Sequence, residues 1–131
     1  MASRILVIED DPASLDLMVY LLKAFGQEPL VARDGQEALD VAYRARPDLI
    51  ICDIQLPRLD GYQVASALKG HPALRTIPLI AVTAYAMVGD RDRILGAGFD
   101  DYIAKPIVPE LFIKQIQSHV DSGLWSKPGT A

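Results

Sequence analysis

The stretch from Asp48 to Asp53 is an apolar run, Leu-Ile-Ile-Cys, that is bounded by carboxylates and ends at Asp53. A short continuous apolar run of this kind is typical of a strand buried on both faces, as in a parallel sheet covered by helices. Residues 55–61 contain Pro and Gly and predict a loop followed by the start of a helix. Asp53 is therefore expected at the carboxyl end of a central strand, the edge where open α/β sheets place their ligand crevices.

Four further apolar segments alternate with amphipathic ones along the chain. The expected strands are residues 5–8, 29–32, 48–53, 78–83 and 101–104. The expected helices are residues 12–25, 35–46, 61–69, 88–95 and 109–120. Strands that alternate with helices through short turns predict an α/β fold, a doubly wound parallel sheet with helices on both faces. The second strand is the weakest and is expected near a sheet edge.

The bulk composition is that of one soluble globular domain. The 131 residues are 50% hydrophobic and 23% charged, with a net charge of −4. This acidic balance argues against nucleic-acid and anionic-membrane partners, since both require a basic face. Cys52 is the single cysteine, which suits a reducing cytosol and a small hydrophobe in a buried strand. No apolar run approaches the roughly 20 residues of a membrane span, so a cytoplasmic location without membrane contact is expected.

Polar residues fall at the carboxyl ends of four predicted strands. Glu9 and Asp10 follow the first strand, Asp53 ends the third, Thr83 ends the fourth and Lys105 follows the fifth. Because these ends share one edge of a parallel sheet, the side chains are expected to converge there. Carboxylates so close together repel one another. Lys105 supplies one balancing charge, and Mg²⁺, which binds carboxylates, waters and phosphate, is the natural second.

With these motifs in place, the chain resembles the receiver (response-regulator) domain of bacterial two-component signalling over about residues 4–120. The matching segments are Val7-Ile8-Glu9-Asp10-Asp11-Pro12, Asp53 to Gly61, Val82-Thr83-Ala84 and Tyr102 to Ile107. The resemblance implies a flavodoxin-like fold of five parallel strands in the order 2-1-3-4-5. A receiver domain is expected over residues 1–121, and the Ser-, Gly- and Pro-containing residues 122–131 are expected to form a mobile tail.

The resemblance assigns roles at the acidic edge. Asp53 would be the phosphoacceptor that attacks a phosphohistidine. Asp10 would bind Mg²⁺ directly and Glu9 through a water, with Asp53 and the backbone carbonyl of Gln55 as further ligands. Lys105 would pair with a phosphoryl oxygen.

The resemblance also implies a switch. Thr83 would hydrogen-bond a second phosphoryl oxygen, and Tyr102 matches the aromatic residue whose ring position changes with that hydroxyl. Gln55 and Tyr85 match positions that tune the lifetime of the phosphoryl group. A cis peptide is expected between Lys105 and Pro106.

The function so implied is signalling by protein contact rather than enzymatic turnover of a separate substrate. The phosphoryl donor would be a histidine kinase or a histidine phosphotransfer protein. The downstream protein target would bind the face formed by helix 88–95, strand 101–104 and the last helix. Asp100 and Asp101 match part of the charge pattern of receivers that dimerise there, but the last helix lacks the matching Arg residues, so a monomer is expected.

Three alternatives stay open at this point. The first is a receiver excised from a hybrid sensor kinase, with residues 121–131 as the start of a linker. The second is an aspartyl-phosphate phosphatase of the haloacid-dehalogenase type, which needs a carboxylate where this chain has Gln55. The third is an FMN carrier, which needs a phosphate-cradling loop where this chain has Glu9-Asp10-Asp11. A plain packing role is the alternative to the switch role for Tyr102, and His71 and His119 are expected to be solvated.

Overall fold

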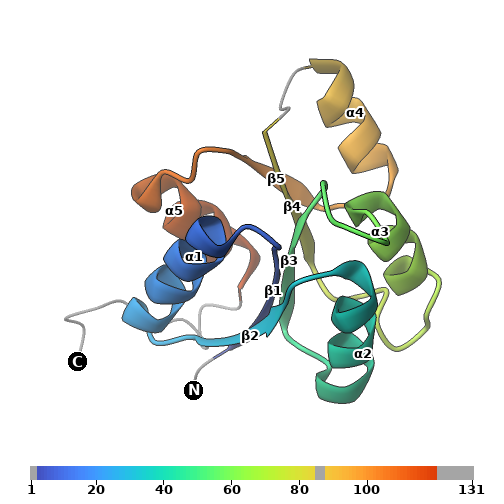
Figure 1. The fold of residues 1–131 in the computed structure, drawn as a ribbon, viewed down its shortest axis with the longest axis horizontal. Helices are drawn as coiled ribbons and strands as arrows, with labels where there is room; N and C mark the ends of the chain where they lie inside the picture. Colours follow the sequence, from blue (N-terminus) through green and yellow to red (C-terminus); the bar gives the residue numbers. More distant parts are fainter. Residues whose placement is uncertain (1–2, 85–87, 121–131) are drawn as a thin grey trace.

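The computed structural model describes residues 3–84 and 88–120, and its centre is one parallel sheet (Figure 1). The strands run in the spatial order β2-β1-β3-β4-β5, as predicted. Their bounds are β1 (Arg4–Ile8), β2 (Glu28–Ala32), β3 (Leu49–Asp53), β4 (Leu79–Thr83) and β5 (Asp101–Ala104). The weak second strand lies at one edge of the sheet and pairs with β1 alone in the described residues, which confirms its expected position.

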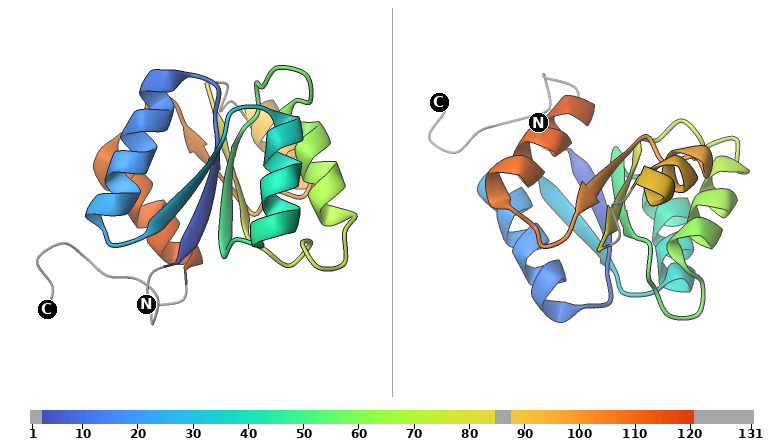
Figure 2. Two further views of the ribbon diagram at one scale, coloured as in Figure 1. Left: turned by 60° about the horizontal axis from the view of Figure 1, so that its bottom comes forward. Right: turned by 90° about the horizontal axis from the view of Figure 1, so that it is seen from above.

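Helices cover both faces of the sheet (Figure 2). Their bounds are α1 (Pro12–Ala24), α2 (Gly35–Ala45), α3 (Gly61–Lys69), α4 (Val88–Gly96) and α5 (Pro109–His119). The helices α1 and α5 pack on one face, and α2, α3 and α4 pack on the other. This arrangement confirms the predicted doubly wound α/β fold.

Two apolar layers hold the sheet between these helices. Because side chains alternate across a strand, β1 sends Leu6 and Ile8 into one layer and Ile5 and Val7 into the other. Residues of β3 and β4 are buried throughout, as expected for central strands of a covered parallel sheet. Phe112 of α5 is 0% exposed and is among the largest side chains that the core encloses.

Local sequence signals set the helix ends that border the functional edge. The Asp11 side chain accepts a hydrogen bond from the Ser14 N–H and caps α1. Asp34 caps α2 in the same way, and Asp60 forms a capping box with Gln63 at α3. At the opposite edge of the sheet, Gly26 follows the end of α1 with a φ of +80°, a conformation that glycine adopts without steric cost.

Some sequence predictions concern residues that the structure does not describe. Tyr85 and residues 121–131 are outside, so the boundary at residue 121 and the character of the tail stay predictions. Within residues 3–84 and 88–120, no helix combines the length and apolarity needed to cross a membrane.

Candidate functional site: an acidic cluster at the carboxyl edge of the sheet

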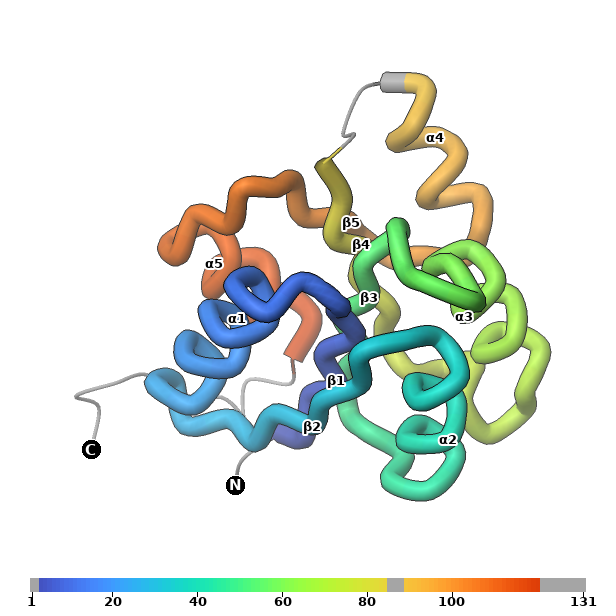
Figure 3. The backbone as a smooth tube through the Cα atoms, in the orientation of Figure 1, coloured from blue at the N-terminus to red at the C-terminus, as the bar shows by residue number. Residues whose placement is uncertain are grey.

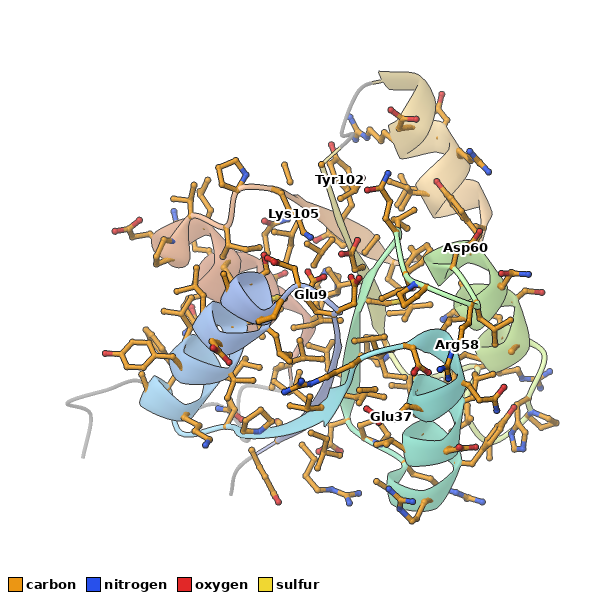
Figure 4. The ribbon with its side chains drawn as sticks, in the orientation of Figure 1. Glu9, Glu37, Arg58, Asp60, Tyr102 and Lys105 are labelled. Atoms are coloured by element: carbon orange, nitrogen blue, oxygen red, sulfur yellow. The ribbon has the colours of Figure 1, made fainter. Side chains whose placement is uncertain are left out.

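Strand register brings the predicted residues to one edge of the sheet. Ile8 of β1 is level with Cys52 of β3, so Glu9 and Asp53 follow as neighbours. Across β4 and β5, Thr83 is level with Ala104, which places Lys105 one residue beyond. Figure 4 shows the Glu9 and Lys105 side chains near each other at this edge. The parallel topology therefore assembles the site as the sequence predicted.

The carboxylates of Glu9, Asp10 and Asp53 form one cluster, with a ligand oxygen from each lying within 4.8 Å of the others. Asp10 is exposed, whereas Glu9 is 0% and Asp53 only 4% exposed. An array of hard oxygen donors, open to solvent on one side, fits a divalent cation that keeps several of its waters. The donor chemistry therefore matches the predicted Mg²⁺ site.

Lys105 lies against the buried side of this cluster. Its Nζ donates a hydrogen bond to Asp53 Oδ2 at 2.9 Å and forms an ion pair with Glu9 Oε1, also at 2.9 Å. Burial alone would lower the pKa of the Lys105 ammonium, but the contacts with Asp53 and Glu9 outweigh it and raise that pKa. Lys105 is therefore a fixed positive charge beside Asp53.

Glu9 is a buried carboxylate with incomplete compensation. Its Oε2 accepts hydrogen bonds from the N–H groups of Asp10 and Asp11, at 3.1 and 3.3 Å. Its Oε1 is fully buried and, apart from the ion pair with Lys105, has no hydrogen-bond partner in the described structure. Burial is the main cause that raises the pKa of Glu9 to about 7, and Asp53 raises it further, although Lys105 and the Asp11 N–H oppose them. An added cation would offset the electrostatic cost of burying the ionised Glu9 carboxylate.

The β3–α3 loop orients Asp53. Asp53 Oδ1 accepts a hydrogen bond from the Gln55 N–H at 3.0 Å, while Lys105 holds its other oxygen. The Gly61 N–H donates to the Ile54 carbonyl at 2.8 Å, which brings the start of α3 directly against the end of β3. A Cβ at Gly61 would lie 2.6 Å from the Asp53 carbonyl oxygen, so only glycine permits this approach. One oxygen of the carboxylate is thus held by this tightly packed loop and the other by Lys105.

The two predicted switch residues lie on the neighbouring strands β4 and β5, where Tyr102 is level with Ala81, two residues before Thr83. Thr83 ends β4 and is 3% exposed, and its carbonyl accepts a hydrogen bond from the Lys105 N–H at 2.8 Å. Tyr102 is half-buried and packs against the core layer beneath α2, α3 and α4. Its carbonyl accepts a hydrogen bond from Gln115 Nε2 of α5 at 2.8 Å. The Lys105–Pro106 peptide is cis, as expected.

One contact at the opposite end of β5 contradicts the sequence-based expectation. His119 was expected to be solvated, but its Nε2 lies 2.9 Å from Asp101 Oδ2 and its side chain is 23% exposed. The prediction failed because helical periodicity did not show that the last turn of α5 returns to the first residue of β5. A histidine in a last helical turn, together with a carboxylate opening a neighbouring strand, was the only available signal.

Comparison with known proteins decides what this edge belongs to. The sequence profile of the response regulator receiver domain matches residues 5–117. The chain belongs to the response regulator receiver family. It is 45% identical to the polar-differentiation response regulator DivK of Brucella anthropi over 120 residues, which cover 92% of this chain and 98% of that protein. The fold is therefore a receiver fold, and the acidic cluster at its carboxyl edge fits a phosphoacceptor site.

Solved receiver structures agree with this assignment. The receiver domain of the sensor histidine kinase PA1611 from Pseudomonas aeruginosa, which has a magnesium ion in its active-site cleft, is similar with a TM-score of 0.83 and 35% identity. That match covers 90% of this chain and 97% of that one. The chemotaxis response regulator CheY4 of Vibrio cholerae gives a TM-score of 0.88 at 25% identity, covering 92% of this receiver and 100% of that chain. Nothing in these comparisons supports the phosphatase or FMN-carrier alternatives.

Proposed function

We propose that Asp53 is the phosphoacceptor of this receiver and takes a phosphoryl group from a phosphohistidine on a histidine kinase or a histidine phosphotransfer protein. The observation that carries the proposal is the setting of Asp53, a nearly buried carboxylate held by Gln55 N–H and Lys105 Nζ inside an acidic cluster. A carboxylate that served only as a helix cap would face the helix N-terminus, whereas here Asp60 caps α3. Asp53 is therefore available to act as the phosphoacceptor.

The proposed reaction is a direct transfer between two side chains. A carboxylate oxygen of Asp53 attacks the phosphorus atom, and a P–O bond forms as the P–N bond to the donor imidazole breaks. The electron pair of that P–N bond leaves with the imidazole nitrogen, which takes up a proton. Such transfers depend on in-line positioning and charge neutralisation more than on covalent chemistry by the protein. The fixed orientation of Asp53 meets the first requirement.

Mg²⁺ is the proposed cofactor, held by the carboxylates of Asp10 and Asp53, by Glu9 through a water and by the Gln55 carbonyl. When bound, it supplies positive charge opposite the phosphoryl oxygens and offsets repulsion among the carboxylates. Lys105 supplies the second positive charge, because its ammonium already lies 2.9 Å from Asp53 Oδ2. After transfer, this ammonium would pair with a phosphoryl oxygen.

The same geometry suggests how phosphorylation is reported. The phosphoryl group adds about −1.5 to −2 charge and strong acceptor oxygens next to the end of β4. We propose that the Thr83 hydroxyl donates a hydrogen bond to one of these oxygens and that the Tyr102 ring then changes position. Gln55, which is exposed beside Asp53, and Tyr85 are proposed to tune the lifetime of the phosphoryl group by shielding it from water.

The proposed downstream face comprises α4, β5 and α5. Three large apolar side chains are exposed there, Leu95, Val108 and Leu111. A groove of about 270 Å³ beside Lys105 is lined largely by apolar side chains, including Val108, Leu111 and Phe112. Asp101 pairs with His119, and Asp100 accepts a hydrogen bond from the Leu79 N–H. Because both carboxylates already have partners in their own chain, we propose a monomer.

Phosphorylation by acetyl phosphate, read by intact mass, tests the proposal. The wild type is expected to gain a labile phosphoryl adduct that requires Mg²⁺, and Asp53→Asn is expected to gain none. Asp16→Asn, an exposed carboxylate on α1 with the same charge change, is the matched control and should behave as the wild type. An adduct of equal size on folded Asp53→Asn would refute the assignment.

A further inference from the structure

Arg93 of α4 lies over the ring of Tyr62 in α3, with its guanidinium carbon 4.3 Å from the ring centroid. This is a cation–π contact between two helices that are consecutive along the chain. Tyr62 in turn meets Phe99 edge to face, with ring centroids 6.3 Å apart and an interplanar angle of 80°. Phe99 is 3% exposed. The three residues connect the solvent side of α4 to the core.

Few other described side chains fasten α4. Ile94 is 1% exposed and is the helix's described buried side chain, whereas Arg91 and Leu95 are exposed. In Figures 1 and 3 the first turn of α4 stands clear of the sheet, and its last turn lies beside α3. By contrast, α5 buries three large apolar side chains, Phe112, Ile113 and Ile116. A single surface contact therefore carries unusual weight in fixing α4.

We propose that the Arg93–Tyr62 pair is a latch that holds α4 in its unphosphorylated position and so opposes activation of the receiver. This inference rests on the proposed phosphoacceptor function. Tyr62, Tyr102, Phe99 and Ile94 all pack in the same core layer. A change in the position of the Tyr102 ring would therefore alter the packing around Tyr62 and Phe99, which carry the latch. A contact made in one state and weakened in the other shifts the balance between them by its differential energy.

The latch predicts a measurable change in ligand affinity. A contact of this kind at an exposed position corresponds to about a two- to fivefold change in a two-state equilibrium. When the binding-competent state is the minor one, the apparent affinity of an activating ligand scales with its population. Removing the latch is therefore expected to tighten binding of beryllofluoride, an analogue of the phosphoryl group, by about two- to fivefold.

The experiment is calorimetric titration of beryllofluoride in saturating Mg²⁺ with the full chain. Arg93→Gln removes the cation, Tyr62→Leu removes the ring, and the double variant removes both. Two controls are matched to these changes. Arg91→Gln makes the same charge change at an exposed position of α4 two residues earlier, on another side of the helix, and Tyr62→Phe keeps the aromatic ring. Mg²⁺ affinity is measured alongside, because the latch does not touch the metal ligands.

The expected pattern is specific to a latch. Arg93→Gln and Tyr62→Leu each tighten beryllofluoride binding, the double variant adds nothing further, and both controls match the wild type. Unchanged or weakened binding in Arg93→Gln would overturn the latch, as would additive effects in the double variant. Loss of thermal stability without tighter binding would show a purely structural contact and overturn it too. A wild type that binds no beryllofluoride would instead refute the phosphoacceptor function on which the latch rests.

Discussion

The interior of the sheet and the two carboxylates that end β3 and follow β1 are both buried but opposite in chemistry. Along β3, Ile51 and Cys52 are 0% exposed and apolar, and the next residue, Asp53, is 4% exposed and acidic. Along β1, Ile8 gives way in the same manner to Glu9. Burial of the first kind stabilises the fold, whereas burial of the second kind opposes it unless the charge is compensated. Burial of apolar side chains in the interior thus offsets the cost of a cluster of charges that the proposed function requires.

The largest effect is expected where the apolar interior is cut. Phe112→Ala removes a fully buried ring between α5 and the sheet and should lower the free energy of unfolding by about 3–5 kcal/mol. Because the cavity lies in the core, the loss should be equal with and without Mg²⁺. Urea unfolding in both conditions measures it. A loss below about 1 kcal/mol would mean that the core relaxes around the gap and that the contrast with the edge is overstated.

The carboxyl edge should respond to Mg²⁺ where the interior does not. A ligand that binds only the folded state raises the free energy of unfolding by about 2.7 kcal/mol at a hundredfold excess over its Kd. Thermal melts across a Mg²⁺ titration should show this gain in the wild type and most of it lost in Asp10→Asn, because the Asp10 carboxylate belongs to the cluster and is proposed to bind Mg²⁺ directly. Asp16→Asn should keep the full gain. Equal gains in all three proteins would place the metal elsewhere.

Neutralising one buried edge charge should stabilise the metal-free protein. The pKa of Glu9 is raised to about 7, so the fold favours its neutral form. The ionised form therefore subtracts from stability, and the loss sets in as pH rises from the ordinary value of 4.5 through 7. Glu9→Gln in chelator at pH 8 should be more stable than the wild type by about 1–2 kcal/mol.

Urea unfolding at pH 8 and pH 5 checks this prediction for Glu9→Gln. The advantage of the variant should shrink at the lower pH, where Glu9 is protonated in the folded wild type, and Mg²⁺ affinity should fall at either pH. A variant that is less stable than the wild type at pH 8 would show that the ion pair with Lys105 outweighs the cost of burial. Burial of Glu9 at the edge would then stabilise the fold, as burial of apolar side chains does in the interior.

The sequence was sufficient for features that depend on order along the chain. Apolar runs that end in Glu9, Asp53 and Thr83 predicted the strands, and parallel topology alone required their carboxyl ends to meet. What it could not show is which helix faces oppose each other. The contacts of Arg93 with Tyr62 and of His119 with Asp101 each join elements whose mutual rotation is set by packing. Periodicity predicts which side of a helix is apolar but not which residue it meets.

The smallest of these effects concerns a contact that joins the two regions. Gln115 projects from α5, whose apolar side packs in the core, and its Nε2 donates to the carbonyl of Tyr102 in β5 at 2.8 Å. Gln115→Ala removes the donor from a partly buried carbonyl and should cost about 1 kcal/mol. Gln115→Glu removes the donor while keeping the length of the side chain, and it should cost at least as much because two acceptors then face each other. Chemical denaturation gives the change in unfolding free energy for both variants.

If Gln115→Ala is neutral, water replaces the side chain at this carbonyl. If its cost exceeds about 2 kcal/mol, Gln115 contributes more than one hydrogen bond to the attachment of α5 to β5, the strand that precedes Lys105. The core and the carboxyl edge would then not be energetically independent at β5.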